Sequence, residues 1–411
     1  MSYSIYYKCK MLHSSRTRMY GRLYMLVSVL ILLAPVSLAV NYTYFKTVDL
    51  TYIPSAVKNG AVCLDGSPPA YHIDRGVGDG ARNWLVFIEG GGWCDTTENC
   101  LNRTKNIFGL GSSKIMQAKN FTGLLSDNQQ LNPYFYNWNR VFVRYCDGGS
   151  FTGNSFDPVN KLHYKGSKVF SAIVKDLLGK GMSNATNALI SGCSAGGLSA
   201  ILNCDKFRSF LPPHTNVKCA SDAGYFLHVK DVFGEYNYAN FYDRIVKLHG
   251  STKNLPKACT SSMRPRSLCF YPQYVVPHVE TPLFLINSAY DAYQIGFILA
   301  PSINNLPQTW ERCKNDTTTC SPDQIEILKG FRSEFLSALP RLGNGSFRGM
   351  FISSCLAHCQ SQLQLNWNWD PGFRIEDKTM AEALGSWSTG RSSLQIIAGS
   401  ELPKICLTTP L

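Results

Sequence analysis

Five runs dominated by apolar residues predict buried strands in this chain. They span residues 83–89, 140–145, 188–190, 282–287 and 350–352. Polar residues do not alternate with apolar ones inside these runs, so each strand is expected to be covered on both faces, as in parallel sheets. Apolar residues at helical spacing in 168–178, and the composition of 197–208, predict helices on either side of the third run. This order predicts an α/β fold with a mostly parallel sheet, helices on both faces and long inserted loops.

The segments between these elements have a weaker pattern of apolar and polar residues. Residues 61–69 are expected to form a strand that closes in a turn, with 71–73 as a possible partner. Residues 95–137 are polar with little periodicity, which indicates a surface excursion. Residues 227–273 are rich in aromatic side chains and predict an inserted cap. No internal repeat, low-complexity linker or break in composition divides the chain, so residues 40–411 are expected to form a single domain.

The first 39 residues have the pattern of a secretory signal peptide. Five basic and no acidic residues precede an apolar stretch that ends in Ser37-Leu38-Ala39, and we predict cleavage after Ala39. An uncleaved signal anchor is the alternative, although Pro35 weakens a membrane-spanning helix. After cleavage we expect a secreted protein with no stable membrane association.

Charge and cysteine content agree with an extracellular location. Removing the five basic residues of the leader lowers the formal net charge from +12 to +7, a moderate excess that suits an anionic polymer or surface. Nucleic acid is not an expected partner in that compartment. Fourteen cysteines remain without Cys9, an even number that predicts up to seven disulfides, with Cys94–Cys100 and Cys313–Cys320 as the first local pairs. Glycosylation sequons begin at Asn41, Asn102, Asn120, Asn184, Asn315 and Asn344.

A candidate nucleophile follows the third apolar run. Gly192-Cys193-Ser194-Ala195-Gly196 has the G-x-S-x-G pattern of a sharp strand-to-helix turn, which exposes the serine hydroxyl because glycine alone tolerates the close backbone approach on either side. A tight turn with an exposed serine is the plainer interpretation. The following helix would direct its N-terminal amides toward negative charge developing near Ser194.

A base and an acid for that serine can be assigned from chain order. In α/β-hydrolases the order is serine, acid, histidine. Asp291 follows the fourth apolar run, in the loop at the sheet's edge, and His358 is the only histidine after it. We therefore predict Ser194 as nucleophile, His358 as general acid and base, and Asp291 as the carboxylate that orients His358. A surface histidine and a turn aspartate are the alternative.

Other chemistries fit the sequence less well. Cys355, His358 and Cys359 have spacing that could hold zinc, but a second cluster is missing and secreted cysteines usually pair, so neither metal nor cofactor is expected. Cys193 precedes the apex of the turn, which favours a structural thiol or disulfide over a nucleophile. Residues 222–227 could lie beside the site or form a structural turn.

Six motifs together resemble the plant pectin acetylesterases, relatives of the secreted carboxylesterase Notum. They are EGGGWC from Glu89, RYCDGGSF from Arg144, GCSAGGL from Gly192, DAGYFL from Asp222, INSAYDAYQI from Ile286 and SCLAHCQ from Ser354. The resemblance implies an α/β-hydrolase-type serine esterase that deacetylates pectin in the cell wall. It implies the same three catalytic residues and oxyanion donors at the backbone amides of Gly92, Trp93 and Ala195.

Substrate and partners follow as expectations from this resemblance. The expected substrate is acetylated pectin, either homogalacturonan or rhamnogalacturonan, and we expect a monomer that needs no metal. A Notum-like esterase that removes a longer acyl group, or a wall-binding protein with a silent site, is the alternative. The chain departs from the family after about residue 378, where Gly385–Arg391 leads to an unfamiliar tail with only Cys406. This tail is expected to leave a disulfide partner missing.

Overall fold

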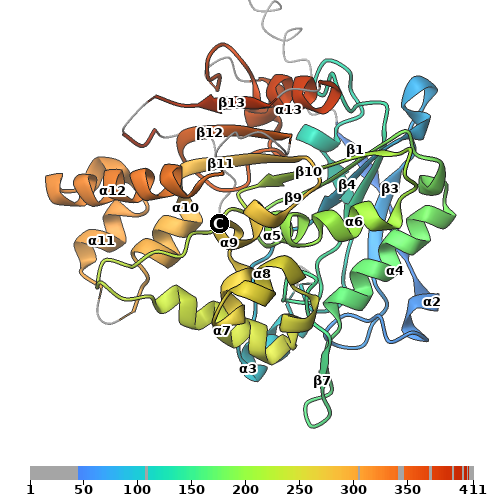
Figure 1. Ribbon diagram of the computed structural model, residues 1–411, viewed down its shortest axis with the longest axis horizontal. Helices are drawn as coiled ribbons and strands as arrows, with labels where there is room; N and C mark the ends of the chain where they lie inside the picture. The colour runs from blue at the N-terminus through green and yellow to red at the C-terminus, as the bar shows by residue number, and fades with distance from the viewer. Residues whose placement is uncertain are drawn as a thin grey trace, which may run out of the picture. The chain divides into compact units, whose positions relative to one another are not determined.

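The computed structural model describes residues 45–106, 110–303, 306–340, 347–369, 373–390, 393–399, 402–404 and 406. The chain divides into Met1–Tyr44, which lies outside the described residues, and a compact unit from Phe45 to Leu411 (Figure 1). The predicted signal peptide and the sequons at Asn41 and Asn344 therefore fall outside the description. Within the described residues, no helix is both long and apolar enough to span a membrane.

A nine-stranded sheet forms the centre of the compact unit. Its order is β13-β12-β11-β10-β9-β4-β6-β3-β2. The strands from β13 to β6 are mutually parallel, whereas β3 is antiparallel to both of its neighbours. The sheet strands are β2 Leu50–Tyr52, β3 Ala70–Asp74, β4 Asn83–Ile88, β6 Asn139–Val143, β9 Asn187–Gly192, β10 Asn216–Asp222, β11 Leu283–Asp291, β12 Arg348–Ala357 and β13 Leu394–Ile397. Two small sheets pair β1 Lys46–Val48 with β5 Lys119–Phe121, and β7 Ser155–Asp157 with β8 Leu162–Tyr164.

Helices connect the strands and cover the sheet. The α-helices are α2 Pro54–Val57, α3 Thr97–Thr104, α4 Gly166–Gly179, α5 Ala195–Leu202, α6 Cys204–Phe210, α7 Asn237–His249, α8 Lys257–Ser262, α9 Pro272–Val275, α10 Ala292–Gln294, α11 Gln308–Cys313, α12 Pro322–Ala338 and α13 Met380–Thr389. Shorter helices are η1 Gly78–Arg82, η2 Gly123–Leu125, η3 Met182–Asn184, η4 Ser251–Asn254, η5 Arg266–Phe270, η6 Val276–His278, η7 Ile295–Leu299, η8 Thr317–Thr319 and η9 Leu365–Trp369. Figure 1 shows α4, α5 and α6 together along the sheet.

The two faces of the sheet bury separate hydrophobic cores. Along β4, Trp84, Val86 and Ile88 join one core, and the intervening Leu85 and Phe87 join the other. Successive side chains of a strand point to opposite faces, so this division shows that both faces are covered. Helices α4 and α5 contribute to the first core, and α13 contributes to the second. The predicted fold class, a mostly parallel sheet with helices on both faces, is confirmed.

Disulfides connect distant parts of the unit. All fourteen cysteines of the described residues are paired, and the two predicted local pairs are confirmed. The bonds are Cys63–Cys146, Cys94–Cys100, Cys193–Cys359, Cys204–Cys219, Cys259–Cys269, Cys313–Cys320 and Cys355–Cys406. The expectation that the unfamiliar tail leaves a cysteine without a partner is wrong, because Cys406 reaches Cys355 on β12.

Two predicted elements differ from the structure. Residues 61–69 form turns and irregular backbone, and β3 pairs with β2 and β6 instead. In this segment Cys63 is bonded to Cys146, and Asp65 accepts hydrogen bonds from both the amide and the hydroxyl of Ser67, which favours a turn. The predicted helix 197–208 is two helices, α5 and α6, which meet at Asn203.

The long polar segment and the aromatic segment both contain helices. Residues 95–137 include α3 and strand β5, and residues 227–273 include α7, α8 and η5. Within α7, Tyr238 and Tyr242 are buried in the first core together with Trp93. Trp93 belongs to the segment 90–93, which follows β4 and which we call the glycine loop. The asparagines of the four described sequons, at residues 102, 120, 184 and 315, are exposed.

Candidate functional site

Ser194 stands at the sharp turn between β9 and α5. Its φ is +58°, a conformation that few non-glycine residues adopt, and it is the residue that precedes the first turn of α5. A Cβ at Gly192 would lie 2.4 Å from the carbonyl oxygen of Gly196, and one at Gly196 would lie 2.3 Å from that of Ile88. The backbone therefore needs glycine at both positions, as the G-x-S-x-G pattern predicts.

Asp291 and His358 come from two neighbouring parallel strands. Strand β11 ends at Asp291 and β12 ends at Ala357, and these two residues are paired in the sheet register. The sequence placed Asp291 in a loop, but it is the last residue of a strand that continues past the apolar run. His358 Nδ1 lies 2.8 Å from Asp291 Oδ2. Asp291 Oδ1 accepts the amide of Gln294, so both carboxylate oxygens are held in place.

The imidazole of His358 has a free nitrogen and an altered pKa. Its Nε2 is buried and has no hydrogen-bond partner within the described part of the chain. Burial acts to lower the pKa of His358, but the charge and hydrogen bond of Asp291 and the charge of Asp222 outweigh burial and raise it. A neutral imidazole whose Nδ1–H is donated to a carboxylate leaves Nε2 as a proton acceptor.

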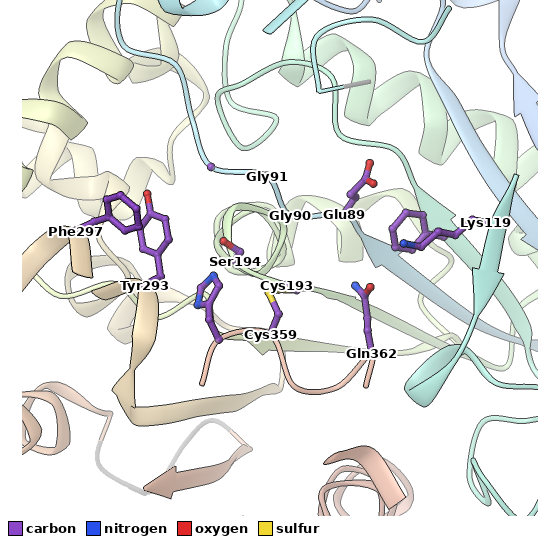
Figure 2. A pocket seen from close by; sticks show the side chains of 13 residues that line it. Glu89, Gly90, Gly91, Lys119, Cys193, Ser194, Tyr293, Phe297, Cys359 and Gln362 are labelled. Atoms are coloured by element: carbon purple, nitrogen blue, oxygen red, sulfur yellow. A yellow bond between two sulfur atoms is a disulfide. The ribbon is translucent and has the colours of Figure 1, made fainter. Parts of the chain in front are cut away.

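A cavity of about 400 Å³ brings Ser194 and His358 together with the glycine loop. Figure 2 shows Ser194 between Tyr293 and Phe297 on one side and Lys119 and Gln362 on the other. The lining residues are Glu89, Gly90, Gly91, Gly92, Lys119, Phe142, Cys193, Ser194, Tyr293, Phe297, His358, Cys359 and Gln362. The hydroxyl and the imidazole predicted to react therefore open into one solvent-accessible space.

The peptide planes of the glycine loop are fixed by hydrogen bonds to their carbonyl groups. Arg103 Nη1 donates to the carbonyl of Gly91 at 2.8 Å, and the hydroxyl of Tyr145 donates to that of Gly92 at 2.9 Å. In a trans peptide the C=O and the following N–H point in opposite directions. These two bonds consequently turn the amides of Gly92 and Trp93 away from Arg103 and Tyr145.

The amide of Ala195 is oriented in the same way. The carbonyl of Ser194 accepts the amide of Leu198 in the first turn of α5, so the N–H of Ala195 points out of the helix N-terminus. Among the described residues, the amides of Gly92, Trp93 and Ala195 have no hydrogen-bond acceptor. Three unpaired donors near a serine hydroxyl could stabilise an oxyanion.

Ser150 joins the glycine loop to the turn at Ser194. Its hydroxyl accepts a hydrogen bond from Trp93 Nε1 at 2.7 Å and donates to the carbonyl of Ala195 at 2.8 Å. Its own amide donates to the Tyr145 hydroxyl. Sequence reasoning assigned no role to Ser150, Tyr145 or Arg103. The only signal was that the first two lie in the RYCDGGSF motif.

Asp222 is a second buried carboxylate near His358. Its Oδ2 accepts the amide and hydroxyl of Ser361, both at 2.7 Å, and its backbone carbonyl accepts the amide of Ser194. Burial raises its pKa to about 6, against the effect of the Ser361 hydrogen bonds and of the charge of His358. Of the two interpretations of residues 222–227, the position beside the site is the one that the structure shows.

The cysteines near the site are occupied in disulfides. Cys355 is bonded to Cys406, and Cys359 is bonded to Cys193. Zinc coordination by Cys355, His358 and Cys359 needs free thiolates, so these residues do not fit a zinc ion. For the same reason Cys193 cannot act as a thiol nucleophile, in agreement with its predicted structural role.

Comparison with known proteins identifies one sequence family and a similar solved structure. The sequence model of the family described as Pectinacetylesterase matches residues 43–407. Pectin acetylesterase 7 of Arabidopsis thaliana is 50% identical over 353 residues, which cover 85% of this chain and 90% of the relative. Palmitoleoyl-protein carboxylesterase notum1a of Danio rerio is 34% identical over 79% of this chain and 63% of the relative. The solved structure of the Wnt deacylase Notum from Drosophila covers 87% of this chain and 98% of its own, with a TM-score of 0.71 and 22% identity.

Proposed function

Because the chain belongs to the pectinacetylesterase family and is a carboxylic ester hydrolase, we propose that it hydrolyses O-acetyl esters of pectin in the cell wall through an acetyl-serine intermediate. The expected polymers are homogalacturonan and rhamnogalacturonan. Secretion as a monomer is part of the proposal. A protein with seven disulfides fits an oxidising compartment.

The mechanism consists of two acyl transfers at one serine. His358 Nε2 accepts the proton of the Ser194 hydroxyl as Oγ bonds to the acetyl carbonyl carbon. The bond from that carbon to the sugar oxygen then breaks, and His358 returns the proton to this oxygen. Water, deprotonated by the same nitrogen, attacks the acetyl-serine, and acetate leaves as Ser194 regains its proton. Asp291 holds the imidazole in the required tautomer and stabilises its charged form.

The amides of Gly92, Trp93 and Ala195 are the proposed donors to the oxyanion that forms in each transfer. Two observations support this assignment. All three amides are unpaired among the described residues, and each is oriented by a hydrogen bond to the carbonyl of its own peptide plane. Donors fixed before the reaction need no reorganisation when charge develops on the oxygen, and one such donor is worth about 3 kcal/mol of transition-state stabilisation.

The buried rings behind the glycine loop support a short acyl group over a long one. Trp93 lies edge-on to Phe226 at 5.0 Å and to Tyr242 at 5.2 Å between ring centroids. Tyr293 is stacked on His358 at 5.3 Å and also lies within 6 Å of Phe226. These rings fill the interior next to the glycine loop, where a long chain would need an apolar channel. An acetyl group needs only the space around Ser194.

The observation that carries the proposal is the buried His358–Asp291 pair opening onto the same cavity as the strained Ser194. Purified protein is expected to release acetate from acetylated pectin faster than from acetylated xylan. It is also expected to hydrolyse aryl acetates faster than long-chain aryl esters. Preference for the long-chain ester would favour the Notum-like alternative, and inactivity of folded protein toward every ester would favour a silent wall-binding protein.

A serine substitution tests the assignment of the nucleophile. Ser194→Ala removes only the hydroxyl, so we expect unchanged thermal unfolding and a loss of aryl acetate hydrolysis of about 10⁵-fold or more. Ser191→Ala is the matched control, because that hydroxyl is buried in β9 three residues earlier and does not line the cavity. Wild-type turnover by Ser194→Ala would refute the assignment.

A further inference from the structure

The two ends of the catalytic cavity differ in chemistry. Tyr293 and Phe297 form an aromatic end, whereas Glu89, Lys119 and Gln362 present polar groups at the other, with Ser194 between them (Figure 2). An acyl group and the hydroxyl group that it esterifies leave the reacting carbon in different directions. A polar end beside Ser194 therefore suits the sugar rather than the acyl group.

Among the described residues, Lys119 is the one lysine or arginine that lines this cavity. Its backbone is held in β5, where it pairs with Val48 of β1. Its ammonium lies 4.9 Å from the centroid of the Phe142 ring, which itself lines the cavity. Contact with an aromatic face limits where the long side chain can go and leaves the ammonium protons free to bind an anion.

The ammonium of Lys119 is not committed to another residue. In the described ranges it makes neither an ion pair nor a hydrogen bond. Glu89 lines the same end, but its Oε2 is held by Arg144 Nε at 2.9 Å and by the amide of Tyr145 at 3.0 Å. Arg144 thus offsets the charge of Glu89, and Lys119 remains available to an anion from solvent.

A second basic residue near the site offers a contrast. Arg244 lines a neighbouring cavity of about 430 Å³ that shares Tyr293 and Phe297 with the catalytic cavity. Its guanidinium is already paired with Asp95, with Nε and Nη2 both 2.8 Å from Oδ2. An incoming anion would have to compete with Asp95 for Arg244, whereas none of the described carboxylates is paired with Lys119.

We propose that Lys119 binds the carboxylate of a galacturonate unit adjacent to the acetylated sugar, with the side-chain amide of Gln362 as a further donor. The inference rests on the proposed function and makes it more specific. The preferred substrate is then acetylated galacturonan whose neighbouring carboxyl group is free rather than methyl-esterified. Lys119 is a specificity-determining residue and takes no part in bond breaking.

The test compares Lys119→Met with the wild type on three substrates. Methionine keeps the apolar stem over Phe142 and removes the charge. On acetylated, demethylated polygalacturonate we expect kcat/KM to fall about tenfold, the usual scale for a hydrogen bond to a charged group. On the same polymer after methyl esterification, and on an aryl acetate, kcat/KM should change less than twofold. Added salt should slow the wild type more than the variant on the charged polymer.

Lys175→Met is the matched control, because Lys175 is exposed on α4 and does not line the cavity. It should behave as the wild type on all three substrates. An unchanged kcat/KM of Lys119→Met on the demethylated polymer would overturn this inference alone, and so would an equal loss on the aryl acetate. Failure of the wild type to release acetate from either polymer would overturn the proposed function together with the inference.

Discussion

The two halves of the site are positioned by different regions of the molecule. Ser194 and His358 follow strands of the parallel sheet and Asp291 ends one, and the register of β11 and β12 places Asp291 beside His358. The glycine loop also follows a strand, but its peptide planes are set by side chains outside the sheet, Arg103 of α3 and Tyr145. Sheet register thus fixes the side chains that we propose to react, and long-range hydrogen bonds fix the proposed amide donors.

The two halves of the site should respond differently to substitution. A strand end is supported by many backbone hydrogen bonds, so substituting a catalytic side chain there should change chemistry and leave the fold intact. A peptide plane held by one side chain can turn when that side chain is removed. Variants of the first group should therefore lose activity at constant stability, and variants of the second group should lose activity through altered geometry.

After removal of the Ser194 hydroxyl, the largest effect on the half of the site that the sheet positions is expected from Asp291→Asn. Loss of the carboxylate removes the acceptor that fixes the tautomer of His358, and kcat for an aryl acetate should fall by about 10³- to 10⁴-fold. Asparagine retains an oxygen that can accept the amide of Gln294, so the thermal midpoint should change little. Steady-state kinetics and thermal unfolding measure the two quantities. Near-normal turnover would show that Asp291 is not the orienting acid.

A smaller effect on kcat is expected from Arg103→Met, which acts on the glycine loop, the other half of the site. Without the bond to the Gly91 carbonyl, the peptide that carries the Gly92 amide is free to turn, and kcat should fall by about 10- to 100-fold with little change in KM. The matched control is Lys105→Met, because Lys105 is exposed at the end of the same helix. Equal losses in both variants, or a loss explained by unfolding, would show that Arg103 does not act through the loop.

The sheet-positioned half is also the part that the sequence predicts. Each apolar run marks a strand, and a serine, a carboxylate and a histidine that follow such runs lie along the same carboxyl edge of a parallel sheet. The structure places Asp291 and His358 in contact and opens Ser194 and His358 into one cavity. Local disulfides such as Cys94–Cys100 were equally predictable, since short loops close easily.

The remaining features depend on contacts between distant residues, which periodicity does not encode. Arg103 lies in a polar segment that reads as a surface excursion, yet it reaches the glycine loop. Cys193 and Cys359 are separated by 166 residues, and Cys406 finds its partner on β12. Asp222 ends a strand as Asp291 does, so the sequence pattern does not separate the two carboxylates. Their contacts do, because Asp222 accepts the hydroxyl of Ser361 and Asp291 contacts His358.

The smallest effect on kcat/KM is expected from Asp222→Asn. This variant separates the role of Asp222 from that of Asp291, the other carboxylate near His358. The proposed mechanism requires neutral His358, so kcat/KM should fall as pH falls through the pKa of this histidine. The negative charge of Asp222 helps to raise that pKa. With asparagine, the acid limb should therefore move to lower pH, while the plateau stays within about threefold because the Ser361 donors keep an oxygen acceptor.

The pH window of this experiment follows from the shifts of the two pKa values. The pKa of His358 lies above its ordinary value, and that of Asp222 is about 6, so the carboxylate is largely charged where the histidine titrates. Asp157→Asn removes a partly exposed carboxylate outside the cavity and should leave the profile unchanged. An acid limb in Asp222→Asn that coincides with the wild type, or moves to higher pH, would show that Asp222 acts through packing and not through its charge on His358.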